Sequence, residues 1–333
     1  IRADEVLSLA RSDRSKVVET DMPNHTKWFK PEVSSELSAL RRAIRSQSHI
    51  WARRFFWVTL AEAIRLTSND RTSTFKLHAR PKDEIERRNF SPIEMFADIS
   101  KRNIEDLGIY YDELANRGLL DRGRYKSECE VVIGDTSKHI ISSNGDNKFD
   151  LLVTSPPYGD NLSTITYGQH SYLPLHWIDL SDIKDELDNS SLRTTQEIDR
   201  RSLGGRSKHE MNNQEQLLRL ESSSLAAVLD DLESAPKDRK QRVIAFYGDF
   251  RNSIENILAS LNPNAYMIWT VGNRRVGNHE IPNDEVVMQM MEYRGSLMVS
   301  KIKRSILNKR MAHRNAIAST MKDETILIAR KVN

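Results

Sequence analysis

A short motif of chemically useful residues ends an apolar segment near the middle of the chain, and it consists of Thr154, Ser155, Pro156, Pro157 and Tyr158. The two prolines fix two φ angles and remove two N–H donors. Pro156 also drives Ser155 toward an extended conformation. The motif therefore predicts a rigid loop that presents one hydroxyl, backbone carbonyls and one aromatic ring. Rigid acceptors stabilise developing charge without reorganising during a reaction.

The chemistry that suits this loop is the activation of an amine attached to an aromatic base. The lone pair of the exocyclic amine of cytosine or adenine is delocalised into the ring, so the amine is a weak nucleophile. The Ser155 hydroxyl and the Pro156 carbonyl could accept hydrogen bonds from the two N–H groups of this amine. Tyr158 could stack on a base rotated out of a duplex. A Pro-Pro turn with a surface tyrosine explains the same motif without chemistry, and the flanking segments favour the functional interpretation.

Two apolar segments lead into this loop and into a second loop that precedes it. Residues 149–153 form a run typical of a buried parallel strand. The run from Cys129 to Gly134 predicts another strand, which ends at Gly134 and Asp135. Ligands of open α/β sheets bind beside the carboxyl ends of the strands. We therefore expect both loops at one edge of a sheet.

Further elements of the sheet are predicted downstream of the motif. A helix is expected at 284–293, where Val287, Met290 and Met291 share one side. A strand with its exit loop is expected at 264–274, and further strands are expected at 296–302 and 324–330.

The segment before the sheet predicts helices. Apolar side chains recur there at helical spacing, and Pro31 suits the first turn of a helix. Helices are expected at 32–45 and 50–66, and one helix or two at 92–117. The predicted domains are a helical N-terminal region at 1–128 and a catalytic core at 129–333, with a polar insertion at 160–242 as a candidate DNA-recognition region.

Composition restricts the class of protein. A chain of 333 residues can bury a sizeable core. The single cysteine, Cys129, allows no disulfide, and its place in a predicted strand favours burial. We find no membrane span and no signal-peptide pattern, which predicts a cytoplasmic protein without a membrane partner. The formal net charge is only +3, so affinity for nucleic acid must come from local basic patches.

The spacing VVIGDTSKHI…FDLLVTSPPYGDN resembles the strand-end motifs of the amino-group DNA methyltransferases, which transfer methyl from S-adenosylmethionine to cytosine N4 or adenine N6. The loop in that family is usually D-P-P-Y or N-P-P-Y for adenine and S-P-P-Y for cytosine. The resemblance covers residues 129–333 and implies the cytosine-N4 branch. It also implies an α/β, Rossmann-like methyltransferase sheet, whose first half is incomplete in this chain. In such a sheet the last two strands, here 296–302 and 324–330, form an antiparallel pair.

The resemblance implies a role for each candidate site residue. The catalytic residues are Ser155, Pro156, Pro157 and Tyr158. The residues expected to bind the cofactor S-adenosylmethionine are Gly134, Asp135 and Thr154, with Asp135 beside the cofactor adenine. Double-stranded DNA is the expected substrate, and the candidate DNA contacts are Arg206, Lys208, Arg274, Arg275, Lys309 and Arg310. A charged surface insertion without base readout is the alternative for the polar segment. We expect no metal.

The chain departs from the family in one respect. The family holds the methionine part of the cofactor with an F-x-G-x-G loop, where glycine lets the backbone approach the ligand. None of the 13 glycines forms this pattern. The loop is therefore expected on a second polypeptide or in a segment removed from this sequence, unless the chain descends from an enzyme that has lost the cofactor. The alternatives are an adenine-N6 methyltransferase and a catalytically silent DNA-binding subunit.

Overall fold

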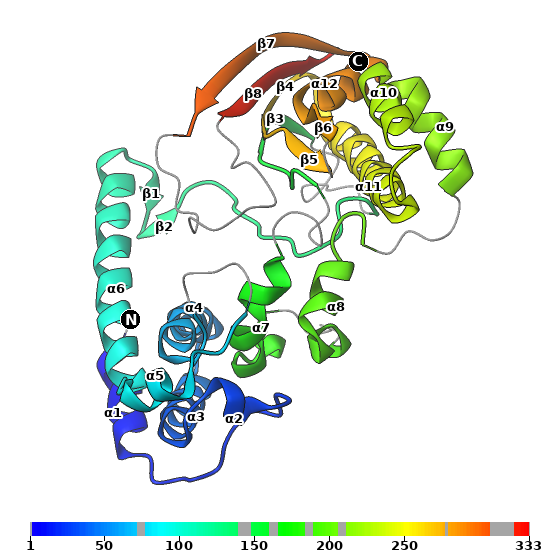
Figure 1. Ribbon diagram of the computed structural model, residues 1–333. Coiled ribbons are helices and arrows are strands. Elements are labelled where there is room, and N and C mark those ends of the chain that lie inside the picture. The colour runs from blue at the N-terminus through cyan, green and yellow to red at the C-terminus, as the bar shows by residue number, and fades with distance from the viewer. Residues whose placement is uncertain are drawn as a thin grey trace. The chain divides into compact units, whose positions relative to one another are not determined.

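The computed structural model describes residues 2–71, 77–138, 148–159, 166–183, 189–205, 211–276, 279–306 and 323–332. The chain divides into two compact units (Figure 1). Unit 1 comprises Ile1–Ile133 and Gly168–Thr195, and unit 2 comprises Gly134–Tyr167 and Gln196–Asn333. This division differs from the predicted one, because Gly168–Thr195 was expected in the catalytic core and packs with the N-terminal region.

Unit 1 is largely helical. Its longer elements are α1 (Ala3–Ser12), α3 (Pro31–Arg45), α4 (Ile50–Thr67), α6 (Pro92–Asn116) and α7 (Tyr167–Trp177). Its short elements are α2 (His25–Trp28), α5 (Lys82–Arg87), the 3-10 helices η1 (Leu180–Asp182) and η2 (Asn189–Arg193), and a small pair of strands, β1 (Leu120–Asp121) and β2 (Arg124–Tyr125). The predicted helices are confirmed, the last of them as the single helix α6, and Pro31 occupies the first turn of α3. Leu37, Leu40 and Ile44 are fully buried, as their spacing predicts.

Unit 2 contains a four-stranded mixed sheet in the order β3-β4-β8-β7. β3 (Phe149–Thr154) runs parallel to β4 (Leu261–Val271). β8 (Asp323–Lys331) lies antiparallel to β4, and β7 (Ser296–Ser305) lies antiparallel to β8. These four predicted strands and the antiparallel terminal pair are confirmed. A short hairpin follows β4 and consists of β5 (Arg274–Val276) and β6 (His279–Ile281).

Helices cover one face of this sheet. They are α9 (Met211–Glu221), α10 (Ser223–Asp231), α11 (Lys237–Ser260) and α12 (Asn283–Tyr293), which share one hydrophobic core with β4 and β8. The short helix α8 (Thr195–Arg200) contributes no residue to this core. β4 turns alternate side chains into that core, among them Met267 and Trp269. The predicted helix at 284–293 is confirmed as α12, which buries Val287, Met290 and Met291.

The predicted strand from Cys129 to Gly134 is wrong. The described residues 126–138 contain no strand, and Val131 is 87% exposed. A β-branched run becomes a strand only when its backbone groups pair with a neighbour. Among the described strands β3 pairs with β4 alone, so this segment joins no ladder. For the same reason Cys129 is exposed, and its predicted burial is also wrong.

β3 is less buried than a central parallel strand. Leu152 packs against the core, whereas Leu151 is 55% exposed and Val153 is 68% exposed. This alternation is typical of a strand that is covered on one face. No helix among the described residues has both the length and the apolar character that a membrane span requires.

Candidate functional site

The predicted catalytic loop lies at the carboxyl edge of the two parallel strands. Thr154, the last residue of β3, pairs with Trp269 of β4. The loop from Ser155 onward therefore leaves the sheet beside the end of β4. Ser155 is exposed and Tyr158 is half-buried. The edge that the sequence predicts for these residues is confirmed.

Asn283, the first residue of α12, fixes the backbone of this loop. Its Nδ2 donates to the carbonyl of Tyr158 and to the carbonyl of Gly272, each at 2.7 Å. Its Oδ1 accepts from the hydroxyl of Tyr247. Asn283 is 3% exposed and Tyr247 is fully buried. All the polar atoms of this amide are therefore engaged within the protein.

A second contact fixes the other end of Tyr158. Its hydroxyl donates to Glu324 Oε1 at 2.9 Å, and Glu324 pairs with Arg304. Burial raises the pKa of Tyr158, and a hydrogen bond from the Ser155 hydroxyl offsets part of this increase. The Arg304 guanidinium holds the pKa of Glu324 below its usual range. The phenol is therefore neutral and faces an ionised carboxylate at neutral pH.

The residue after the tyrosine is a glycine for a steric reason. A Cβ at Gly159 would lie 1.8 Å from Arg274 Nη1. Arg274 is 9% exposed, and its guanidinium lies 5.3 Å from the centre of the Phe246 ring. Arg274, a predicted DNA contact, thus packs beneath the loop, whereas its neighbour Arg275 is exposed.

The predicted cofactor residue Asp135 lies in a loop that is bound to α11. Asn256 donates to the carbonyl of Thr136 at 2.9 Å. Asp135 itself accepts from Ser137 and pairs with Lys138 at 2.8 Å. Burial raises the pKa of Asp135, but the hydrogen bonds from Lys138 and Ser137 outweigh this and hold it below its usual range. Asp135 is therefore an ionised acceptor.

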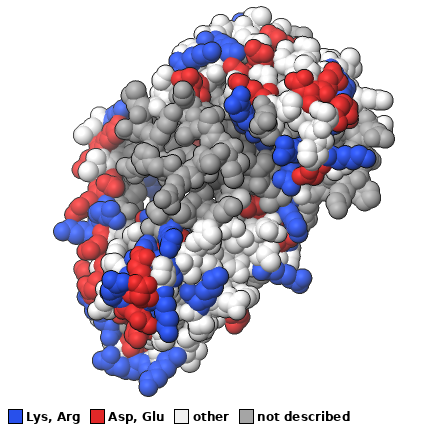
Figure 2. Space-filling view, viewed as in Figure 1, with Lys and Arg blue, Asp and Glu red and all other residues white. Residues whose placement is uncertain are grey.

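The structure gives less support to the other predicted site residues. Gly134 has open space where a side chain would be, so its location does not require glycine. The predicted DNA contacts Arg206, Lys208, Lys309 and Arg310 lie outside the described residues. On the face shown in Figure 2, basic and acidic side chains are interspersed over the described surface. This pattern agrees with the small net charge of +3.

Sequence reasoning missed three residues of the site, namely Tyr247, Asn283 and Glu324. Asn283 follows Pro282 at the start of a predicted helix, a position where asparagine is common for reasons of capping alone. Glu324 begins a predicted strand. Neither context signals a contact with Tyr158, so no pattern in the sequence could have identified them.

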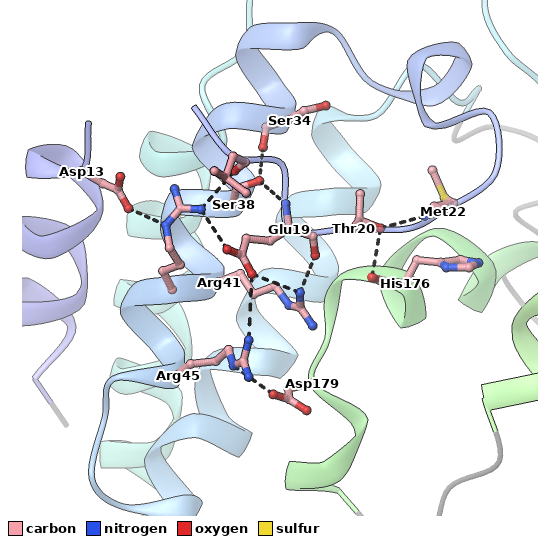
Figure 3. A network of polar contacts seen from close by, with 12 residues as sticks. Asp13, Glu19, Thr20, Met22, Ser34, Ser38, Arg41, Arg45, His176 and Asp179 are labelled. Carbon is pink, nitrogen blue, oxygen red and sulfur yellow. Dashed lines mark hydrogen bonds and ion pairs between the residues drawn. The ribbon is translucent and has the colours of Figure 1, made fainter. Parts of the chain in front are cut away.

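A second polar cluster lies in unit 1 and centres on Glu19 (Figure 3). Glu19 pairs with Arg41 and Arg42, at 3.5 and 3.2 Å, and its backbone N–H donates to Ser38 Oγ. Arg45 reaches Asp179 at 3.0 Å. The cluster borders an open cavity of about 490 Å³. Its charges already compensate one another, which indicates a structural role.

Comparison with known proteins finds a relative among the methyltransferases. The chain is 28% identical over 309 residues to the Type II methyltransferase M.MvaI of Kocuria varians. The alignment covers 92% of this chain and 64% of that protein, so the chain spans less than two thirds of its relative. No protein-family model matches the chain. The chain is thus similar to a Type II methyltransferase, and its mixed α/β sheet with a helical N-terminal region is consistent with that similarity.

Proposed function

We propose that this chain carries the catalytic loop of a site-specific DNA methyltransferase that modifies the N4 amine of cytosine. The observation that carries the proposal is the placement of Ser155 to Tyr158. The loop leaves the carboxyl edge of the sheet, its backbone is held by Asn283, and the chain is similar to a Type II methyltransferase.

The proposed roles follow from what each group offers. Ser155 is exposed, so its hydroxyl is available to accept from the amine of a base. The carbonyl of Pro156 is the second acceptor. Two acceptors on the two N–H bonds draw the nitrogen lone pair out of conjugation, and their fixed positions lower the barrier. The phenol of Tyr158 already bonds to Glu324, which leaves the aromatic ring as the part that stacks on an extruded base.

S-adenosylmethionine is the proposed cofactor, and it supplies an electrophilic methyl group when bound. The residues of this chain fit part of that molecule. Asp135 offers an ionised carboxylate to an amine or hydroxyl, and Thr154 ends the strand beside the loop. The glycine-rich backbone expected around the methionine part has no counterpart among the 13 glycines. We therefore propose that a second polypeptide, or a segment beyond this sequence, completes the cofactor site.

Double-stranded DNA is the proposed substrate. Arg275 is exposed and can contact phosphate, and the same role is proposed for Arg206, Lys208, Lys309 and Arg310. The buried Arg274 supports the loop, and its direct contact with DNA stays a prediction. The insertion at 160–242 stays a candidate for DNA recognition, and the cytoplasmic location stays a prediction.

Nucleoside mass spectrometry tests the proposal. Plasmid DNA is incubated with S-adenosylmethionine and the chain, with and without a polypeptide that carries F-x-G-x-G. The expected product is N4-methylcytosine, formed by the complete assembly and absent with Ser155→Ala. Ser8→Ala is the matched control, because Ser8 is an exposed serine on α1. N6-methyladenine as the only product would refute the assignment of the base.

The second candidate function is a silent DNA-binding subunit, which the absent glycine-rich loop favours. Calorimetry with S-adenosylmethionine separates the two. We expect the isolated chain to bind the cofactor weakly or not at all and the complete assembly to bind it. Tight binding by the isolated chain would show that the cofactor site is misplaced. Binding by the assembly without any methylated nucleoside would support the silent subunit.

A further inference from the structure

We propose that Asn283 and Glu324 are positioning residues that clamp the two ends of Tyr158 and thereby set the geometry of the catalytic loop. The inference rests on the proposed function, because the loop matters only if it acts on a base. Its physical basis is independent of the reaction and lies in the hydrogen bonds that join Tyr158 to Asn283 and Glu324.

The first half of the clamp is an amide that joins two strand ends. Tyr158 lies four residues beyond β3, and Gly272 lies directly beyond β4. Asn283 donates to both carbonyls at 2.7 Å. These two bonds fasten the loop after β3 to the end of the neighbouring parallel strand. The position of Ser155 relative to the sheet is thereby restricted.

The chemistry of this position requires asparagine. The side chain must donate two hydrogen bonds to carbonyls and accept one from the hydroxyl of Tyr247, and only a primary amide of this length can do both. Aspartate has nearly the same shape, but it places a carboxylate oxygen against the two carbonyl oxygens. Alanine leaves two carbonyls without their partner at a site where the side chain is 3% exposed.

Contacts of the next residue fix the start of the helix that carries Asn283. The backbone N–H of the next residue, Asp284, donates to Asn273 Oδ1 at 3.2 Å. Lys301 of β7 lies 2.7 Å from Asp284 Oδ2, and Thr325 of β8 donates to the same oxygen at 3.3 Å. The start of α12 is thus tied to the segment that follows β4 and to the strands β7 and β8. These contacts fix the position from which the Asn283 amide extends.

The second half of the clamp holds the aromatic ring. Glu324 accepts from the hydroxyl of Tyr158 at 2.9 Å, and Arg304 pairs with its other oxygen. With the carbonyl and the hydroxyl both engaged, a swing of the side chain about its Cα–Cβ bond carries the hydroxyl away from Glu324 and breaks a hydrogen bond. A ring held in place loses less conformational entropy when a base stacks on it.

The two halves predict different kinetic effects. Asn283 sets the backbone that carries the acceptors for the amine, so its loss should lower kcat. Glu324 orients a ring that binds the extruded base, so its loss should raise KM for DNA as well as lower kcat.

Kinetics of the complete assembly test both halves. We expect Asn283→Asp and Asn283→Ala to lower kcat by about 100-fold while KM for DNA changes by about threefold or less. The matched control is Asn262→Ala, since Asn262 ties the opposite end of β3 to β4 through Lys148 and Asp150. Glu324→Gln should raise KM, and Asp323→Asn, which alters the neighbouring carboxylate bonded to Ser305, should not.

A spectroscopic measurement keeps the clamp testable without turnover. The chain is labelled with 3-fluorotyrosine at its 9 tyrosines, and the ¹⁹F resonance of Tyr158 is assigned by its loss in Tyr158→Phe. We expect this resonance to shift or broaden in Asn283→Asp and in Glu324→Gln but not in the two control variants.

The outcomes separate the clamp from the function. An unchanged resonance in both clamp variants overturns the inference, and so does a normal kcat for Asn283→Asp in an active assembly. If the wild-type assembly methylates nothing and the resonance still responds, the clamp stands and the proposed function fails. Asn283→Asp guards against misfolding because it preserves volume, and a cooperative thermal transition above the assay temperature establishes that it is folded.

Discussion

The Glu19 cluster of unit 1 and the Tyr158 clamp of unit 2 hold their surroundings by different means. Glu19 faces three arginines, Arg41, Arg42 and Arg45, within 3.9 Å, so each ion pair has a substitute. Asn283 holds the loop by two bonds from one neutral amide, so a substitution of this one residue removes both. A cluster in which several arginines can pair with one glutamate tolerates the loss of one ion pair, which suits a structural support. An amide whose two N–H groups each hold one carbonyl allows a single loop geometry, which suits a reactive loop.

The largest expected effect contrasts one serine from each region. Ser155→Ala removes an acceptor of the amine and should lower kcat by about 100- to 1,000-fold, with DNA affinity nearly unchanged. Ser38→Ala removes a hydroxyl that bonds to Glu19 and Ser34 and should leave kcat unchanged. Rates measured with the complete assembly, together with DNA binding by fluorescence anisotropy, test the contrast. A similar loss of kcat in both variants breaks it.

The second expected effect concerns stability. Asn283→Ala leaves two carbonyls and the hydroxyl of Tyr247 without their partner, which should cost about 3 kcal/mol of unfolding free energy. Glu19→Gln keeps an acceptor among three arginines and should cost about 1 kcal/mol. Urea denaturation of the two variants measures the difference. Equal losses of unfolding free energy in the two variants would show that the amide and the charge cluster tolerate substitution equally well.

The comparison also shows which features a sequence reveals. The loop at Ser155 to Tyr158 could be found because its residue types are contiguous and proline restricts the backbone locally. Its supports could not, because Asn283 and Glu324 lie 125 and 166 residues from Tyr158 along the chain. Such contacts depend on how strands and helices meet, which no local pattern records.

The same reasoning separates the confirmed elements from the wrong one. Helices such as α3 and α12 follow from the spacing of apolar side chains, since a helix forms its hydrogen bonds within its own segment. The run at Val131 to Ile133 has high β propensity, but a strand needs a partner elsewhere in the chain. None of the described strands forms a ladder with this run, and Val131 is 87% exposed.

A third prediction uses pH to weaken unit 1 selectively. Burial lowers the pKa of His176, against a hydrogen bond with Leu192. A histidine whose folded pKa lies below its unfolded value stabilises the fold above the unfolded pKa of about 6.5. This stability is lost as the pH falls toward the folded pKa. Hydrogen exchange should therefore show α7 opening more at pH 5.5 than at pH 7.5, and less so in His176→Gln.

The clamp should respond in a lower range of pH. The folded pKa of Glu324 is lowered by Arg304, so its contribution is complete above the ordinary glutamate pKa of about 4.3 and is lost only as the pH falls through the lowered value. The ¹⁹F resonance of Tyr158 should stay constant from pH 8 to pH 5.5. A shift of that resonance in parallel with the opening of α7 would contradict the separation between the two regions.

The smallest expected effect tests whether charge matters to the clamp at all. Arg304 pairs with Glu324 from a position where its side chain is 60% exposed, and exposed ion pairs contribute little because water and salt screen them. Arg304→Gln removes this ion pair and leaves the bond between Glu324 and the Tyr158 hydroxyl in place. We expect kcat and KM to change by about threefold or less, whereas Glu324→Gln weakens an acceptor that touches the ring directly and should have the larger effect. Kinetics at low and high salt measure both variants. If Arg304→Gln proves the more damaging, the carboxylate needs its cation to hold the tyrosine, and the clamp then resembles the charged cluster of unit 1 more than it differs from it.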